Sequence, residues 1–428
     1  MPKPRIDRAT SAHVLRRVGF GAPREAVDAA TERGLDATLE ELFARRAGHA
    51  APEAVQRDLD AALATQDLVK LQARWMALIL DDAAPLVERV TLMWHGHFAT
   101  SDAKLGRVRL MHRQNQLFRE QGLGDFRALL HAVAKDPAML LWLDGNQNKV
   151  GRPNENFARE VMELFALGVN GGYTEGDIKE AARAFSGWSV EGSEYAFHAE
   201  EHDRGEKTLF GRGGVFTGEE ALERVLAHPA CPRWVARRLL TTFCVPDPTA
   251  AQCEEWGRVL VEREWRIDAT LERLLRSDLF LGPLARRSRI AGPVELVANV
   301  ALSLRAKVAP IDAMRAAAIM GQVLFMPPSV KGWDGGRTWI HPGTWLARHN
   351  HLMELILAGD AFDARRAYGA DLDQAHVVER VGATLLPDGL DDTLRAVLED
   401  TAKRAGSPVG AARDATALLL TAPEFHLY

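Results

Sequence analysis

The chain has 428 residues, of which 47% are hydrophobic, and a formal net charge of −5 at pH 7. This hydrophobic content suffices for a large buried core, and the acidic balance argues against a nucleic-acid partner, which would require a basic face. The three cysteines form no Cys-x-x-Cys pair, so the sequence indicates neither a disulfide framework nor a thiolate zinc site.

The start of the chain, residues 1–19, mixes charged side chains with short apolar stretches and lacks the apolar core of a signal peptide. No apolar run in the chain is long enough to span a bilayer. We therefore expect a cytoplasmic protein with no membrane span. Two basic pairs, Arg237-Arg238 and Arg286-Arg287, are interpreted as solvated helix surface.

Apolar residues recur with helical periodicity along most of the chain, which predicts a mostly α-helical fold. We expect a large orthogonal bundle of helices forming a single domain over 1–428, with a soft boundary near 215–220. That boundary separates a motif-rich half, 80–215, from a plainer helical half, 220–428. The expected helices are 85–98, 106–119, 125–134, 155–167, 175–186, 219–227, 232–244, 250–263, 268–276, 293–305, 311–324, 343–357, 374–384, 390–403 and 409–420.

Two stretches interrupt this helical pattern. Aromatic and polar residues alternate over 188–210, which predicts a small β-hairpin insertion. The stretch 326–342, called the Trp-rich loop below, holds three prolines, three glycines and two tryptophans. Long loops inside a compact chain are usually functional, so we expect this loop to fold back over the motif-rich half, near the helix that follows Asn154, and to wall a pocket.

The helix expected at 155–167 gathers apolar residues on one side and carries a narrow polar arc. Asn156, Glu160 and Glu163 fall within this arc, and Glu160 lies nearest the apolar border, where it is the one most readily drawn inward. The ordinary alternative is an amphipathic helix whose wet face carries ion pairs between Arg159 and the glutamates four residues before and after it.

Histidines occur in two further motifs. His95 and His97 flank Gly96, and on a regular helix their side chains point about 200° apart, so both reach one metal only if the helix ends or distorts at the glycine. His202 and Asp203 form a pair in a non-helical stretch. They can supply a metal ligand with its orienting carboxylate, or a turn in which Asp203 binds backbone amides.

These segments together resemble the bacterial "domain of unknown function 1800" family, and the resemblance spans nearly the whole chain. The activity of this family is not established. The landmarks follow the family's order: LRRVGFG at 15–21, ERVTLMWHGHF at 88–98, NENFAREVMELF at 154–165, YTEGD at 173–177, ARAFSGW at 182–188, HD at 202–203 with Lys207 and Gly211, KGW at 331–333 and LLLTAPEF at 418–425.

The resemblance also carries expectations beyond the fold. Many relatives look exported, whereas this chain shows no signal peptide. Relatives often have asparagine at the position of Gly96, so residue 96 is not expected to be an essential ligand. Relatives are often encoded beside a protein that resembles sulfatases and alkaline phosphatases, which implies such a protein as a partner.

The first functional hypothesis is a metal-dependent enzyme, since imidazole and carboxylate ligands without thiolates suit zinc, iron or manganese. We expect Glu160, His202 and at least one of His95 and His97 to converge on one ion. The ordinary alternative pairs Glu160 with Arg183. The assigned roles are metal ligands His95, His97, Glu160, His202 and Asp203; catalytic Glu160, Glu163, Arg159 and Lys207; and substrate-binding Asn154, Asn156 and Trp333.

The second hypothesis is a non-catalytic partner or assembly module that works with the sulfatase- or phosphatase-like protein. In that case the polar helix is a buried network that fixes the fold, and the Trp-rich loop is a docking surface. The sequence holds neither a dinucleotide-binding nor a P-loop fingerprint, so no nucleotide cofactor is expected.

Overall fold

In the computed structural model, which describes residues 6–45 and 53–428, helices dominate and strands are confined to short hairpins, which confirms the expected fold. The first half contains α1 Arg8–Val18, α2 Arg24–Arg33, α3 Leu35–Ala44, α4 Glu53–Thr65, α5 Leu68–Asp81, α6 Pro85–His97, α7 Asp102–Leu105, α8 Val108–Gln121, α9 Phe126–Ala134, α10 Pro137–Trp142, α11 Asn156–Glu160 and α12 Glu175–Ala184. The second half contains α13 Gly218–Leu226, α14 Ala230–Phe243, α15 Ala250–Glu262, α16 Ile267–Leu274, α17 Asp278–Leu281, α18 Pro293–Ser303, α19 Pro310–Ile319, α20 Pro342–Leu357, α21 Ala364–Tyr368, α22 Val377–Leu385, α23 Asp392–Arg404 and α24 Pro408–Thr421.

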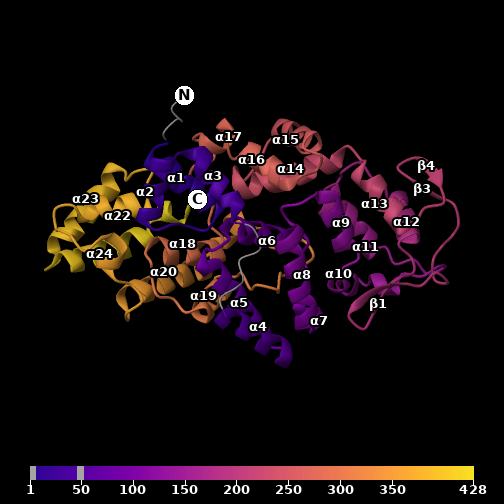
Figure 1. Ribbon diagram of the computed structural model, residues 1–428, viewed down its shortest axis with the longest axis horizontal. Coiled ribbons are helices and arrows are strands. Elements are labelled where there is room, and N and C mark those ends of the chain that lie inside the picture. Colours follow the sequence, from indigo (N-terminus) through magenta and orange to yellow (C-terminus); the bar gives the residue numbers. More distant parts are fainter. Residues whose placement is uncertain (1–5, 46–52) are drawn as a thin grey trace.

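The strands form two antiparallel hairpins. The first pairs β1 Trp188–Glu191 with β2 Glu194–Phe197, and the second pairs β3 Lys207–Leu209 with β4 Arg212–Gly214. The expected β insertion around 188–210 is thus present, and its second hairpin runs a few residues further. Figure 1 shows these hairpins at one end of an elongated molecule and α22 to α24 at the other.

Helix starts follow the local chemistry of the sequence. The capping box expected at Thr174 and Asp177 is present, with each side chain accepting from the other residue's backbone N–H at the start of α12. Capping boxes also start α13 at Thr217 and α15 at Thr249. None of the helices in the described ranges is long and apolar enough to cross a membrane.

The apolar pattern predicts no helix before residue 85, although α1 to α5 precede it. In α1 the inward face carries Ser11, His13, Arg16 and Arg17, all of them buried. Arg17 donates to carbonyl groups from three distant parts of the chain, among them Tyr428. Polar side chains on the inner face break the apolar periodicity, and this hides the helix from a pattern search.

Helix α6 occupies the centre of the molecule (Figure 1). All of its residues are buried. In the described part of the chain the apolar core falls into two clusters, one drawn from residues 14–280 and one extending to Tyr428. Because α6 contributes Val90 and Trp94 to the first cluster and Leu92 to the second, groups at its C-terminal end lie where the two clusters meet.

Candidate functional site

His95 is an internal hydrogen-bond acceptor on α6. It is 1% exposed, and its Nε2 accepts the backbone N–H of Phe325 at 3.1 Å. Its ring packs between those of Trp75, Phe325 and Trp333, with centroid separations of 5.2, 5.6 and 5.5 Å. Burial lowers the pKa of His95 to about 3, so the imidazole is neutral and anchors the segment that leads into the Trp-rich loop.

His97 has a different partner from His95. Its Nε2 lies 2.9 Å from the carbonyl oxygen of Phe165. A carbonyl can only accept, so Nε2 carries the proton and Nδ1 keeps a free lone pair. Burial, followed by the charge of Arg238, lowers the pKa of His97 to about 3. The side chain is therefore a neutral imidazole whose single remaining acceptor is Nδ1.

The segment after α11 is a π-helix, Val161–Ala166, rather than the continuous α-helix expected at 155–167. Its C-terminal carbonyls bind side chains from other elements: Leu164 accepts from Trp234 Nε1 at 2.8 Å, and Phe165 accepts from His97. Short π-helical turns are frequent at functional sites. Here the turn fixes two rings that belong to helices α6 and α14.

The acidic residues of this motif lie on the outer face of its helix. Arg159 pairs with Glu155 at 3.1 Å, Glu163 at 3.9 Å and Glu175 at 2.8 Å, which confirms the ion pairs of the amphipathic-helix alternative. Partial burial, then the nearby charge of Glu163, raises the pKa of Glu160. The alternative partner Arg183 does not pair with Glu160, because it binds other carboxylates.

Asn154 and Asn156 stabilise the start of this helix. The backbone N–H of Asn154 donates to the side chain of Asn148, and that of Asn156 donates to the side chain of Asn154. The side-chain amide of Asn156 donates to the carbonyl of Leu143 at 3.1 Å. These bonds satisfy polar groups at a helix N-terminus, which accounts for both residues structurally.

The His-Asp pair forms a turn, the second of the two alternatives considered for it. His202 Nδ1 bonds the carbonyl of Ser186 at 2.9 Å, while Asp203 pairs with Arg183 at 2.7 Å and accepts the backbone N–H two residues further on. Lys207 is buried and donates to two carbonyls of the same turn. These residues hold the segment between the two hairpins together.

The structure does not bring the expected metal ligands together. Across residues 6–45 and 53–428, no group of three or more His, Cys, Asp or Glu side chains could hold a metal ion. The expected convergence of Glu160 and His202 with His95 or His97 is therefore absent. Each imidazole has a backbone partner instead, and Asp203 is committed to an arginine.

Polar groups converge instead in a cleft of about 600 Å³ beside α6. Its walls come from the C-terminal end of α6, one face of α14, the start of α18 and the Trp-rich loop. Three of its lining residues are tryptophans, Trp234, Trp333 and Trp339. Of the residues predicted as functional, His97 and Trp333 line this cleft, whereas Asn154 lines a separate surface hollow.

The cleft is basic although the chain as a whole is acidic. Its lining, counted over the described residues, holds twice as many basic as acidic side chains. The basic residues are Arg89, Arg237, Arg238, Arg289, Lys331 and Arg337, and the acidic residues are Asp247, Glu295 and Asp334. The interpretation of Arg237 and Arg238 as solvated helix surface is thus corrected, because the packing of α14 against α6 turns both toward the cleft.

One buried carboxylate balances two of these arginines. Glu295 pairs with Arg89 and with Arg289, the latter at 3.2 Å. Burial alone would raise the pKa of Glu295, but the charges of Arg289 and Arg89 and the N–H of Gly292 lower it to about 2. The ionised carboxylate holds the arginines in place and leaves one positive charge in excess.

Among the described residues, two guanidinium nitrogens at the cleft lack acceptors. Arg238 donates from Nη2 to the carbonyl of Met93 at 2.7 Å, but its Nε is buried and has no hydrogen-bond partner among the described residues. The same holds for Nη1 of Arg289. An unpaired buried donor is costly, and an anion or a water molecule in the cleft would relieve that cost.

The Trp-rich loop docks on α6 through two glycines. Gly332 has φ +81°, and a Cβ there would overlap the carbonyl oxygen of Gly96. This close approach places Trp333 against His95, as described above. The loop therefore folds back over the motif-rich half and walls a pocket as expected. It contacts α6, and Leu164 of the helix expected at 155–167 lines the same cleft, although Asn154 itself does not.

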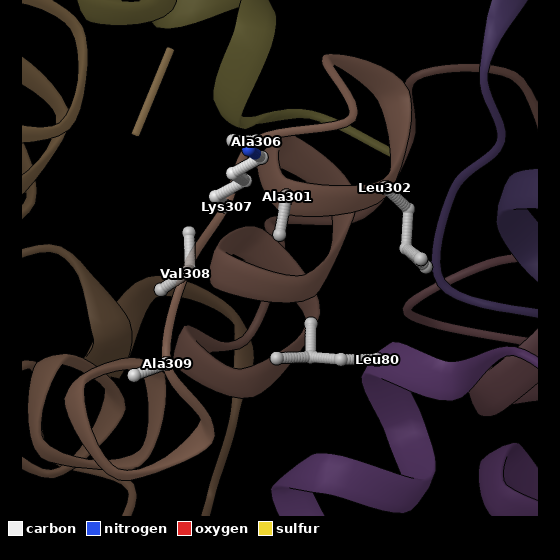
Figure 2. Close-up of a pocket in the computed structure, with 7 residues that line it drawn as sticks. All are labelled: Leu80, Ala301, Leu302, Ala306, Lys307, Val308 and Ala309. Carbon is white, nitrogen blue, oxygen red and sulfur yellow. The ribbon is translucent and has the colours of Figure 1, made fainter. Parts of the chain in front are cut away.

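A second hollow of about 360 Å³ lies where α5 and α18 end (Figure 2). Its lining is almost entirely aliphatic, and among the described residues Lys307 is its one charged group. Without convergent polar groups it offers no basis for specific recognition. The lining residues are Leu80, Ala301, Leu302, Ala306, Lys307, Val308 and Ala309.

These observations define a large multi-helical protein whose candidate site is a basic cleft walled by tryptophans. A family model with the description "Protein of unknown function (DUF1800)" matches residues 13–427. Since this match covers nearly the whole chain, the chain belongs to the DUF1800 family. No curated protein and no solved structure matches it.

Proposed function

We propose that the protein binds a small anionic ligand in the cleft between α6, α14 and the Trp-rich loop. The observation that carries this proposal is that two residues lining one basic cleft, Arg238 and Arg289, each hold a buried nitrogen, Nε and Nη1, without a hydrogen-bond partner among the described residues. Guanidinium groups bind carboxylates, phosphates and sulfates through charge-assisted hydrogen bonds, which are about twice as strong as neutral ones.

The size and walls of the cleft suit a small molecule. Its volume of about 600 Å³ lies within the range typical of ligand pockets. Trp234 and Trp333 are partly exposed and offer flat apolar surfaces beside the charged groups. A ligand with an anionic group and a compact ring or chain would use both parts of the lining.

The metal-dependent reaction does not fit the residues present. The candidate ligands do not converge, because no group of three or more His, Cys, Asp or Glu side chains among the described residues could hold a metal ion. No step of the proposed function is therefore derived through a metal ion. The anion-binding groups of the proposal are the guanidinium groups of Arg238 and Arg289.

The partner-module hypothesis has less support than ligand binding. It needs the tryptophans of the Trp-rich loop as a docking surface, but Trp339 is buried and Trp333 packs on His95. Both rings attach the loop to the body of the protein. No contact in the described structure favours a sulfatase- or phosphatase-like partner over any other.

Isothermal titration with inorganic phosphate and with sulfate tests the proposal. Replacing Arg238 by methionine removes the guanidinium and keeps a long apolar side chain, so we expect binding to weaken about tenfold or more. Arg395→Met is the matched control, because Arg395 is exposed on α23, away from the cleft, and the change in charge is identical. Equal losses in both variants, or no binding by the unmodified protein, would refute the proposal.

A further inference from the structure

The polar hydrogens of three cleft side chains, His97, Thr241 and Thr242, are committed to the protein. The imidazole Nε2–H of His97 donates to Phe165, which leaves Nδ1 as an acceptor. The hydroxyls of Thr241 and Thr242 both donate to the carbonyl of Arg238, at 3.0 and 2.9 Å, so only their oxygen lone pairs remain free. All three side chains line the cleft.

A carboxylate adds to this set of acceptors. Asp247 lines the cleft, is exposed, and has no ion pair within the described part of the chain. Donors come from other groups: Nε of Arg238, Nη1 of Arg289 and the side-chain nitrogen of Gln322, whose Oε1 is already used by the backbone N–H of Val294. Donors suited to an anion and acceptors suited to hydroxyl groups therefore line the same cleft.

An unsubstituted anion does not complement this lining. A simple alkyl phosphate has only acceptor oxygens as its dianion, so it would satisfy the arginines and leave His97 Nδ1 and the threonine oxygens without a donor. Sites that offer buried hydrogen-bonding groups discriminate strongly against ligands that leave those groups unpaired. Hydroxyl groups on the ligand would supply the missing donors.

We propose, as an inference that rests on the proposed anion binding, that the ligand is a hydroxylated anion such as a sugar phosphate or a sugar acid. Its charged group lies against Arg238 and Arg289, and its hydroxyls donate to His97 Nδ1 and to the oxygens of Thr241 and Thr242. His97 is then a specificity-determining residue, held in its tautomer by the π-helical turn that supplies the carbonyl of Phe165.

The test compares inorganic phosphate, propyl phosphate and glucose 6-phosphate by isothermal titration at pH 8, where both esters are dianions because their second pKa is about 6. We expect glucose 6-phosphate to bind at least about tenfold more tightly than propyl phosphate, the loss expected when buried polar groups stay unpaired. Equal affinities for the two esters would overturn this inference and leave anion binding intact. If none of the three probes binds, the proposed function itself fails.

Two substitutions of His97 test the roles of its two ring nitrogens separately. In His97→Gln the amide nitrogen stands where Nε2 was and can still donate to Phe165, while the acceptor at Nδ1 is lost. In His97→Asn an amide oxygen stands where Nδ1 was. We expect His97→Gln to lose the preference for the sugar ester and to keep phosphate affinity within about twofold, whereas His97→Asn keeps the preference. A preference that survives unchanged in His97→Gln would contradict the assignment.

A third variant, on α14, tests whether the change in preference arises only from a general effect of altering α6. Thr241→Val keeps the shape of the side chain and removes its oxygen acceptor. We expect it to reduce the preference for glucose 6-phosphate over propyl phosphate severalfold without weakening inorganic phosphate. A loss of equal size for all three probes would show that Thr241 supports the fold and does not select the ligand.

Discussion

The Nε2 atom of His97 lies 2.9 Å from the carbonyl oxygen of Phe165, and this bond joins the end of α6 to the π-helical turn at Val161–Ala166. A regular α-helix would direct its last carbonyls along its own axis, whereas the wider turn gives two of them to Trp234 and His97. The most recognisable motif of the chain thus acts on the cleft through its backbone and not through its charged side chains.

Stability should fall as the solution becomes acidic, starting near pH 6.5. Burial lowers the pKa of His13, His95 and His97 to about 3, while the same imidazoles in the unfolded chain titrate near 6.5. A group whose pKa is lower in the folded state contributes stability above its unfolded pKa and loses it as the pH falls toward the folded value. Each imidazole contributes up to about 1.4 kcal/mol per pH unit in this window.

Urea unfolding at pH 7.5, 6, 5 and 4 measures this dependence. We expect His95→Gln to be less stable at pH 7.5 and to show a shallower decline below pH 6.5, since one titrating imidazole is gone. An unfolding free energy that stays constant from pH 7.5 to 4, in wild type and variant alike, would show that the histidines are not held neutral.

The contact between Gly332 and Gly96 should be essential for docking the Trp-rich loop. Gly332→Ala introduces a Cβ that overlaps the carbonyl of Gly96 at a positive φ, so we expect a loss of about 1–3 kcal/mol and altered tryptophan fluorescence. Gly336→Ala is the matched control, because Gly336 also has a positive φ, +55°, but has no atom within 4 Å of the added Cβ. Similar fluorescence and anion affinity in the two variants would contradict this role.

Protein purified without a metal-binding tag should contain no stoichiometric zinc, iron or manganese. The physical reason is that no group of three or more His, Cys, Asp or Glu side chains among the described residues could hold a metal ion. Elemental analysis by mass spectrometry, with dialysis buffer as the blank, makes the measurement. One equivalent of metal per chain, lost in parallel with activity or stability on chelation, would restore the first hypothesis drawn from the sequence.

Local chemistry predicted much of the helical framework. The helices expected from residue 85 onward lie close to the observed ones because apolar periodicity, proline at first turns and the Thr174–Asp177 capping box all act within a few residues. The sequence pattern does not predict the short helices α7, α10, α17 and α21. Helix α1 was missed because its inner face carries Arg16 and Arg17, whose partners lie more than two hundred residues away in the sequence. Periodicity cannot register such distant pairing.

The cleft could not be predicted for a related reason. Its arginines come from separate elements: Arg89 from α6, Arg238 from α14, Arg289 from the segment before α18 and Arg337 from the Trp-rich loop. Only packing brings them together. By residue type the histidines suggest metal ligands, and the sequence therefore draws attention to them and not to the arginines. Their hydrogen-bond partners, however, are backbone carbonyls and amides that any sequence supplies.

Anomalous diffraction from a crystal soaked in tungstate tests the central claim most directly, because it shows where an anion binds and not only that it binds. We expect a peak for the tungsten atom in the cleft, within about 4 Å of the guanidinium groups of Arg238 and Arg289. Charge-assisted contacts span about 2.7–2.9 Å from nitrogen to the oxygen of an oxyanion, and the tungsten atom lies one bond further. The same peak should be absent in the Arg238→Met variant. Peaks confined to other surfaces, with the cleft empty of anion, would contradict it.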